Sequence, residues 1–360
     1  MRRFILAAFV VLAGCSDRTH APIVPAALTI GTNKTVFVGT TRKRDPNGTF
    51  GIHRSNVLQL LELEVSIPPK RDLGTISDGF EKPNPVKDFV IGSQKSFAKP
   101  TDFQAALRRK SDVLNEVTVF VHGYNYSFSD SAFRIAQLAH DLELPSTMVS
   151  YAWPSRGNVL GYEYDADSAL FARDGLQDLL ENIKASGTES IVLVAHSMGG
   201  NVAMETLRQL EIKEPGWSSR NISGVVLISP DINVDLFLAQ TTSFKKLPEP
   251  FVVFKSPADK ALLISARLRW EDERLGSVSD TSKFQHLPID FVDVTEFTTA
   301  SGSNHFTAGS SPALIALLKS AGELDRDFLK GEAGSAGLLP GRKRVLRNAA
   351  QIIIASAGER

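Results

Sequence analysis

The stretch that decides the fold reads Ile191-Val-Leu-Val-Ala-His-Ser-Met-Gly-Gly-Asn201. Its aliphatic residues predict a buried strand, and residues 201–210, with apolar side chains at helical spacing, predict a helix. A serine at a sharp turn between a strand and a helix forms a nucleophile elbow, in which the residues two before and two after it must be small. Ser197 has Ala195 and Gly199 at these positions. The pattern predicts that Ser197 is a nucleophile, and the alternative is a serine that only caps the helix.

The composition limits the class of protein. A chain of 360 residues allows one large or two ordinary domains, and a hydrophobic share of 42% is enough for a sizeable core. The 40 basic and 40 acidic residues balance, so we expect neither a nucleic-acid partner nor a strongly acidic substrate. No metal-ligand cluster, phosphate loop or dinucleotide fingerprint is present in the sequence, so we expect no metal and no cofactor.

The N-terminus predicts export and a lipid anchor. Two arginines precede an apolar run, residues 4–13, which is too short to span a bilayer and is typical of a secretory signal. The run ends in Leu-Ala-Gly-Cys15, which resembles the bacterial lipobox, in which the cysteine is lipidated. The alternative is an ordinary signal peptide cut near a chance cysteine, but Cys15 is the only cysteine, which excludes a disulfide within the chain. Because Ser16 follows it, we expect anchoring in the outer membrane, facing the periplasm.

The remaining pattern predicts an α/β fold, with a mostly parallel sheet and helices on both faces. Besides the strand before Ser197, we expect strands at residues 35–40, 59–65, 117–121, 147–151, 224–229, 251–255 and 289–294. We expect helices at residues 129–142, 166–184 and 312–318. The charged, turn-rich residues 42–51 predict a surface loop. The proline-rich residues 68–100 predict an extension with one short strand at residues 89–91.

The strand at residues 117–121 runs directly into His122-Gly-Tyr-Asn125. In α/β-hydrolases one oxyanion donor is the amide after the nucleophile and the second comes from this loop. We therefore assign the two donors to the amides of Met198 and Tyr124, with the Asn125 side chain as a possible further donor. For His122 we expect a structural role, with hydrogen bonds to nearby backbone.

Ligands of open α/β sheets bind beyond the carboxyl ends of the strands. Trp153 and Arg156 follow the strand at residues 147–151 at this position, so we interpret them, together with Asn125, as substrate-binding residues. The alternative is that they serve only in packing and turn formation.

The order serine, acid, histidine along the chain matches α/β-hydrolases. His305 follows the last strand, where the base of this fold belongs, and we prefer it to His286, which precedes that strand. Asp259 follows the later of two strands that end in an acid, and we prefer it to Asp231, for which helix capping is an alternative role.

Five motifs together resemble a bacterial α/β-hydrolase family of unknown function, described loosely as esterase-like or lipase-like. They are Thr40-Thr-Arg42, Phe120-Val-His-Gly-Tyr-Asn125, Trp153-Pro-Ser-Arg-Gly157, Ala195-His-Ser-Met-Gly-Gly200 and Ser229-Pro-Asp-Ile232. The resemblance covers roughly residues 35–320. It implies the fold and a Ser-His-Asp site more firmly than a substrate.

These observations predict a lipid-anchored serine hydrolase that acts on an acyl ester or a lipid. An acyltransferase or peptidase with the same triad, and a non-catalytic binding module, remain alternatives. The basic residues 342–347 and the following residues 349–355 near the C-terminus predict a solvated or docked helix, or alternatively a basic amphipathic segment that contacts anionic lipid. The expected organisation is a signal peptide (1–14), a tether (15–28), the hydrolase domain with its N-terminal extension (29–325) and a basic tail (326–360).

Overall fold

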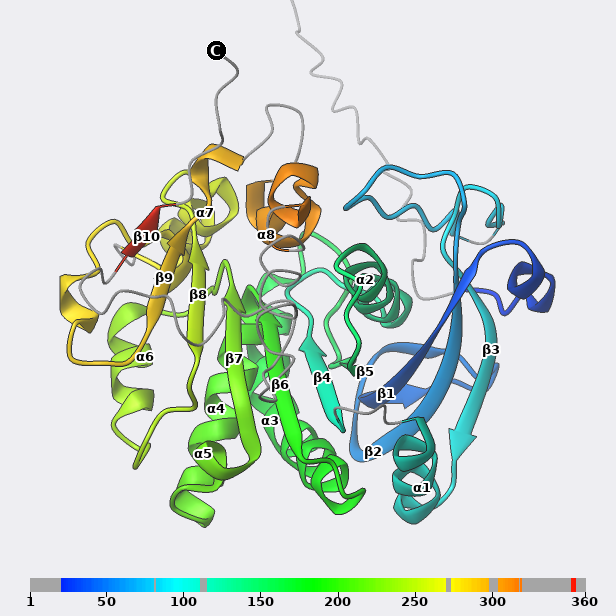
Figure 1. The fold of residues 1–360 in the computed structure, drawn as a ribbon, viewed down its shortest axis with the longest axis horizontal. Helices are drawn as coiled ribbons and strands as arrows, with labels where there is room; N and C mark the ends of the chain where they lie inside the picture. Colours follow the sequence, from blue (N-terminus) through cyan, green and yellow to red (C-terminus); the bar gives the residue numbers. More distant parts are fainter. Residues whose placement is uncertain are drawn as a thin grey trace, which may run out of the picture.

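A computed structural model gives the fold of the chain (Figure 1). It describes residues 21–80, 82–110, 115–269, 273–297, 304–316, 318 and 351–353. The expected signal peptide with Cys15, and the basic residues 342–347, lie outside the described residues. Within these ranges no helix has the length and apolar character needed to cross a membrane.

The described strands form one sheet in the order β10-β9-β8-β7-β6-β4-β5-β1-β2-β3, which runs from left to right in Figure 1. Their bounds are β1 (Thr32–Arg44), β2 (Phe50–Ile67), β3 (Val90–Phe97), β4 (Glu116–Val121), β5 (Thr147–Tyr151), β6 (Ser190–His196), β7 (Ile222–Ile228), β8 (Phe251–Lys255), β9 (Asp290–Asp293) and β10 (Gln351–Ile353). The pairs β1–β2 and β2–β3 are antiparallel, and every other described pair is parallel. The expected α/β-hydrolase fold is confirmed.

Helices cover both faces of the sheet. Their bounds are α1 (Pro100–Lys110), α2 (Phe128–Asp141), α3 (Tyr162–Ala185), α4 (Met198–Lys213), α5 (Trp217–Asn221), α6 (Val234–Thr241), α7 (Lys260–Leu268) and α8 (Thr307–Ser310). Short 3-10 helices are η1 (Pro25–Thr29), η2 (Leu275–Ser277), η3 (Ser282–Phe284), η4 (Thr295–Phe297) and η5 (Asn304–Phe306). Alternate residues of β4 point to opposite faces, as the period of a strand requires. Val119 and Val121 join a core with α1, α3, α4, α5 and α6, whereas Phe120 joins a second core with α2.

Two expectations for the N-terminal part of the sheet differ from the structure. Of residues 42–51, only 45–49 form a turn, because β1 continues to Arg44 and β2 begins at Phe50. The extension holds a longer strand than expected, β3, and α1 begins at its end. In each case pairing with the long strand β2 extends a segment whose local composition favours turns.

At the C-terminal end, helicity follows Pro312 as expected, over residues 312–316. The tail near residue 352 differs from the expected helix. Gln351–Ile353 forms β10, which pairs in parallel with β9. Ile352 and Ile353 are β-branched and suit a strand at the edge of the sheet.

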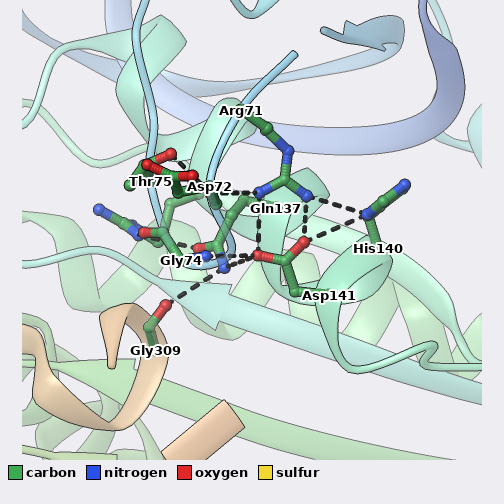
Figure 2. A network of polar contacts seen from close by, with 9 residues as sticks. Arg71, Asp72, Gly74, Thr75, Gln137, His140, Asp141 and Gly309 are labelled. Atoms are coloured by element: carbon green, nitrogen blue, oxygen red, sulfur yellow. Dashed lines mark hydrogen bonds and ion pairs between the residues drawn. The ribbon is translucent and has the colours of Figure 1, made fainter. Parts of the chain in front are cut away.

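A buried ion pair connects the proline-rich extension to the hydrolase core (Figure 2). Arg71 of the extension pairs with Asp141 at the end of α2, and the Asp141 side chain has no exposed surface. The same carboxylate accepts hydrogen bonds from the backbone amide of Gly74 at 2.9 Å and from Gln137 Nε2 at 2.7 Å. Burial acts to raise the pKa of Asp141, but the hydrogen bonds from its neighbours outweigh it and leave the pKa below its ordinary value.

Replacement of Asp141 by asparagine should destabilise the fold at neutral pH. It leaves the Arg71 guanidinium without its anion, and loss of one partner of a buried pair typically costs about 3 kcal/mol or more. Because the folded-state pKa of Asp141 is lowered, its contribution is complete above the unfolded-state value and is lost as the pH falls through the folded-state value. Urea unfolding should therefore show a large difference between wild type and Asp141→Asn at pH 7 and a smaller one near pH 3.

The matched control is Asp72→Asn, which removes an exposed acid from the same extension. We expect its free energy of unfolding to stay within about 0.5 kcal/mol of wild type. An equal loss in both variants, or a difference for Asp141→Asn that does not change with pH, would contradict the assigned role.

Candidate active site

Ser197 lies between β6 and α4 in strained backbone, with φ 54° and ψ −126°. A positive φ is uncommon outside glycine and is retained mainly where surrounding structure enforces it. The tight turn leaves no space behind it, since a Cβ added to Gly199 would lie 2.2 Å from the carbonyl oxygen of His122. The Ser197 side chain makes no capping hydrogen bond to α4, although Ser197 occupies the N-cap position. The simple helix-cap alternative therefore does not describe this serine.

A continuous hydrogen-bond chain connects Ser197, His305 and Asp259. Ser197 Oγ is 2.7 Å from His305 Nε2, and His305 Nδ1 is 2.8 Å from Asp259 Oδ2. The Asp259 side chain is completely buried, while that of His305, in η5, is 16% exposed. The other oxygen of Asp259 accepts from the amides of Ala261 and Leu262 at the start of α7, so the helix fixes the carboxylate.

The side chains of the two alternative residues, Asp231 and His286, take no part in this hydrogen-bond chain. Asp231 pairs with Arg274 at 3.1 Å and accepts hydrogen bonds from Ser265 at 2.7 Å and Tyr162 at 2.9 Å. It does not cap the next helix, because the side chain of Asn233 occupies that position. His286 is exposed and follows η3. The backbone amide of Asp231 donates to the Ser197 carbonyl oxygen at 3.1 Å, but among the described residues no hydrogen bond joins the side chain of Asp231 or His286 to that of Ser197.

The loop after β4 passes directly beside Ser197. A Cβ added to Gly123 would lie 2.8 Å from Ser197 Cβ, so this position requires a glycine. Within the described chain, no backbone or side-chain hydrogen bond uses the amide of Tyr124 or of Met198. Asn125 follows with a positive φ of 62°, and its amide donates to Asp165 Oδ2 at 3.3 Å. Both assigned amides remain candidates for oxyanion donors.

His122 and Trp153 support this loop from inside the protein. His122 Nδ1 is 2.8 Å from the carbonyl oxygen of Gly123, and its Nε2 is 3.1 Å from that of Trp153. The expected structural role of His122 is therefore confirmed. Trp153 Nε1 donates to the His122 carbonyl at 2.6 Å, and the two rings stack with centroids 4.9 Å apart.

The three residues interpreted as substrate-binding have different environments. The Trp153 side chain has no exposed surface, so in this structure it contacts only protein. Arg156 is exposed and lies 5.9 Å from the centre of the Tyr164 ring, and Asn125 is partly exposed beside the Ser197 site. Only Arg156 and Asn125 have surface that a ligand can reach.

Burial keeps two neighbouring histidines neutral. It is the main cause that lowers the pKa of His122 to about 3 and that of His196 well below its ordinary value. The His196 and His305 rings have centroids 4.8 Å apart, and His196 Nε2 is 3.1 Å from the His305 carbonyl oxygen. His196 therefore adds no positive charge beside the imidazole that contacts Ser197.

Sequence reasoning missed two charged residues beneath the loop, Arg42 and Asp165, whose side chains are both completely buried. A signal for Arg42 was available, since β-branched Thr40 and Thr41 extend the expected strand as far as this residue. Over the described ranges, no group of three or more His, Cys, Asp or Glu side chains could hold a metal ion.

The arrangement has a defined chemical capacity. A hydroxyl in contact with an imidazole, which in turn contacts a buried carboxylate, is activated as a nucleophile because the imidazole can accept its proton. The strained elbow and the first amides of α4 place partial positive charge near the serine.

Comparisons with known proteins agree with the fold. A family model described as "Alpha/beta hydrolase of unknown function" (DUF900) matches residues 95–321. An uncharacterised protein of Nostoc sp. is 25% identical over 137 residues, which cover 38% of this chain and 35% of that protein. The chain thus matches about a third of the length of this curated relative.

Two solved structures are similar. One is a serine hydrolase without lid from Xanthomonas campestris, with 15% identity and a TM-score of 0.38, and the match covers 85% of this chain and 97% of that one. The other is a dienelactone hydrolase from Anabaena variabilis, with 12% identity and a TM-score of 0.36, and the match covers 75% of this chain and 93% of that one.

Two asparagine variants should separate the two acids. In Asp259→Asn the amide favours the wrong imidazole tautomer, so the rate at which a fluorophosphonate modifies Ser197 should fall by orders of magnitude, with little change in melting temperature. In Asp231→Asn the buried Arg274 loses its anion, so the melting temperature should fall while the modification rate stays within about tenfold of wild type. A time course of fluorophosphonate labelling and thermal unfolding of both variants measure these two quantities. The opposite pattern would make Asp231 the partner of His305.

Proposed function

Since this chain belongs to the family of α/β-hydrolases of unknown function, we propose that it is a serine hydrolase that cleaves carboxyl esters. The observation that supports this proposal best is the contact chain from Ser197 through His305 to Asp259 at a strained elbow. A serine that served only the fold would need neither the positive φ nor a base at hydrogen-bond distance.

In the proposed reaction, Ser197 Oγ attacks the carbonyl carbon of the ester while His305 Nε2 takes the hydroxyl proton. His305 then gives this proton to the leaving alcohol, and an acyl-enzyme forms on Ser197. Asp259 accepts the Nδ1 hydrogen of His305, which fixes the tautomer and stabilises the imidazolium. Water, deprotonated by His305, hydrolyses the acyl-enzyme and restores the serine.

Negative charge develops on the carbonyl oxygen in both steps. We assign its stabilisation to the amides of Met198, at the start of α4, and Tyr124, in the loop after β4. Preorganised amide donors of this kind typically contribute about a hundredfold to a thousandfold in rate each. Gly123 brings the second donor close to Ser197, because any side chain there would meet the Ser197 Cβ atom.

The same triad also suits transfer of the acyl group to an alcohol or amine, and cleavage of an amide. Product analysis with an added alcohol acceptor separates transfer from hydrolysis, and matched ester and amide substrates separate an esterase from a peptidase. A panel of esters with graded acyl lengths defines the substrate class, which the triad itself does not determine.

The nucleophile is tested by covalent labelling. A fluorophosphonate should give one adduct on folded wild-type protein, located on Ser197 by peptide mass spectrometry, because the activated hydroxyl displaces fluoride from phosphorus. Ser197→Ala should abolish the adduct together with ester turnover, whereas the control Ser219→Ala, on the distant α5, should retain both. A folded wild-type protein that gives neither adduct nor turnover would favour a non-catalytic binding module.

For location, we propose a lipid anchor at Cys15 that holds the protein at the outer membrane, on the periplasmic side. The proposal rests on the Leu-Ala-Gly-Cys15 sequence after the apolar run of residues 4–13. A single acyl chain binds membranes only marginally, so stable anchoring requires several chains or a second contact. The proposed substrate, an acyl ester or a lipid, would then be met at the membrane surface.

Mass spectrometry of the mature N-terminus tests the anchor. We expect the chain to begin at Cys15, with acyl groups on it, and Cys15→Ser to move the protein from the membrane to the soluble fraction because the acceptor thiol is gone. Ser16→Ala is the control and should leave the anchor in place. A free thiol at Cys15, or cleavage at another position, would contradict the proposal.

A further inference from the structure

Arg42 is the residue of the Thr40-Thr-Arg42 motif that the proposed reaction leaves without a role. It lies in β1, and its side chain has no exposed surface. Arginine is almost never fully buried unless its donors are paired, because burial of an unpaired charge is costly. Burial lowers the pKa of Arg42 to about 10, and the nearby carboxylate of Asp165 opposes this shift. The guanidinium therefore remains charged at neutral pH.

The partners of this charge are backbone carbonyls from separate segments. Arg42 Nη1 donates to Gly51 at 2.9 Å and to Ser155 at 3.0 Å, and Nη2 donates to Tyr126 at 2.8 Å. Gly51 belongs to β2, Ser155 follows β5, and Tyr126 lies in the loop after β4. One side chain thus joins the hairpin of β1 and β2 to two loops at the carboxyl ends of the strands.

Asp165 binds the same loop through its carboxylate. Its carboxylate accepts from Ser155 Oγ at 2.5 Å and from the amide of Asn125 at 3.3 Å. Ser155 Oγ in turn accepts from the amide of Tyr126 at 3.2 Å. The amides of Asn125 and Tyr126 and the carbonyl of Tyr126 are therefore all bound to buried groups.

The contacts of Arg42 and Asp165 restrict the backbone on the C-terminal side of Tyr124. Tyr124, whose amide is the second proposed oxyanion donor, is followed by Asn125 with a positive φ of 62°. Such backbone is retained only when its surroundings enforce it. Upstream of Tyr124 the Gly123 carbonyl is fixed by His122, and downstream the fixed groups are those bound to Arg42, Ser155 and Asp165.

We infer that Arg42 is a positioning residue that keeps the Tyr124 amide in donor geometry, in concert with Asp165. The inference rests on the proposed function, because it assigns the fixed loop to the stabilisation of an oxyanion. A planar guanidinium can reach several carbonyls at fixed angles, whereas a lysine ammonium is a point charge on a flexible stem. Arg42→Lys should therefore keep the buried charge and lose the geometry.

The kinetic test compares Arg42→Lys with wild type on a chromogenic acyl ester. We expect kcat to fall about tenfold to a hundredfold, as a donor displaced by about an ångström would require, with KM nearly unchanged. Binding of a trifluoromethyl ketone, whose tetrahedral adduct carries an oxyanion, should weaken by the same factor. The apparent pKa in the pH profile of kcat/KM should not move, because the contact of His305 with Asp259 is untouched.

A second measurement reads the loop without any activity. Hydrogen exchange of the Asn125 and Tyr126 amides should be at least about tenfold faster in Arg42→Lys, whereas exchange in β6 should not change. Arg108→Lys is the matched control, since Arg108 Nε also donates to a backbone carbonyl, that of Ser186, at 2.7 Å, beyond the C-terminal end of α3. This control should match wild type in all readouts.

Each outcome decides the inference. Full kcat with unchanged exchange in Arg42→Lys overturns it, and so does a loss of kcat that the ketone affinity does not follow. If Arg42→Lys does not fold, Asp165→Asn, which keeps the side-chain shape, must show the same changes in the same direction. If wild type itself lacks turnover and labelling, the proposed function fails, and faster loop exchange then supports only a structural role for Arg42.

Discussion

The strained backbone at Ser197 is the constraint on which the site depends. With φ at 54°, β6 ends and α4 begins on either side of a single residue, which directs the hydroxyl away from both elements. The turn leaves no space for a side chain at two positions. A side chain at Gly199 would meet the His122 carbonyl, and one at Gly123 would meet Ser197 itself. The parallel pairing of β4 with β6 brings these two glycines to the same edge of the sheet. The pairing of β4 with β6 thus makes the close contacts around Ser197 possible.

The elbow and its loop could be predicted from sequence because their signals are local. Small residues around Ser197 and a strand that runs into His122-Gly123 need no knowledge of distant contacts. The choice between Asp231 and Asp259 depends on distant contacts, because each acid follows a parallel strand. In the structure Arg274 pairs with Asp231, whereas His305 contacts Asp259. Arg42 was misplaced for the same reason. A charged residue before a turn-rich stretch indicates solvent unless the carbonyls that receive it are known.

Electrostatics around the serine follow one pattern. Charged groups in the interior have fixed counter-groups: Asp231 pairs with Arg274, Asp259 contacts His305, and Asp165 receives backbone and hydroxyl donors. The histidines outside the contact chain, His122 and His196, are kept neutral by burial. The neighbouring histidines therefore add no positive charge beside the His305 ring. The cost of burying charge is offset locally, which leaves the region around Ser197 preorganised.

The position of Arg42 along the chain also bears on what constitutes the smallest working unit of this protein. The family model begins at residue 95, after β1 and β2, yet β1 pairs with β5 and carries the side chain that reaches the Tyr126 carbonyl. A fragment cut at residue 95 would expose the edge of β5 to pairing with other chains. The hairpin of β1 and β2 is therefore an integral part of the hydrolase module, which begins well before the first residue that the family model matches.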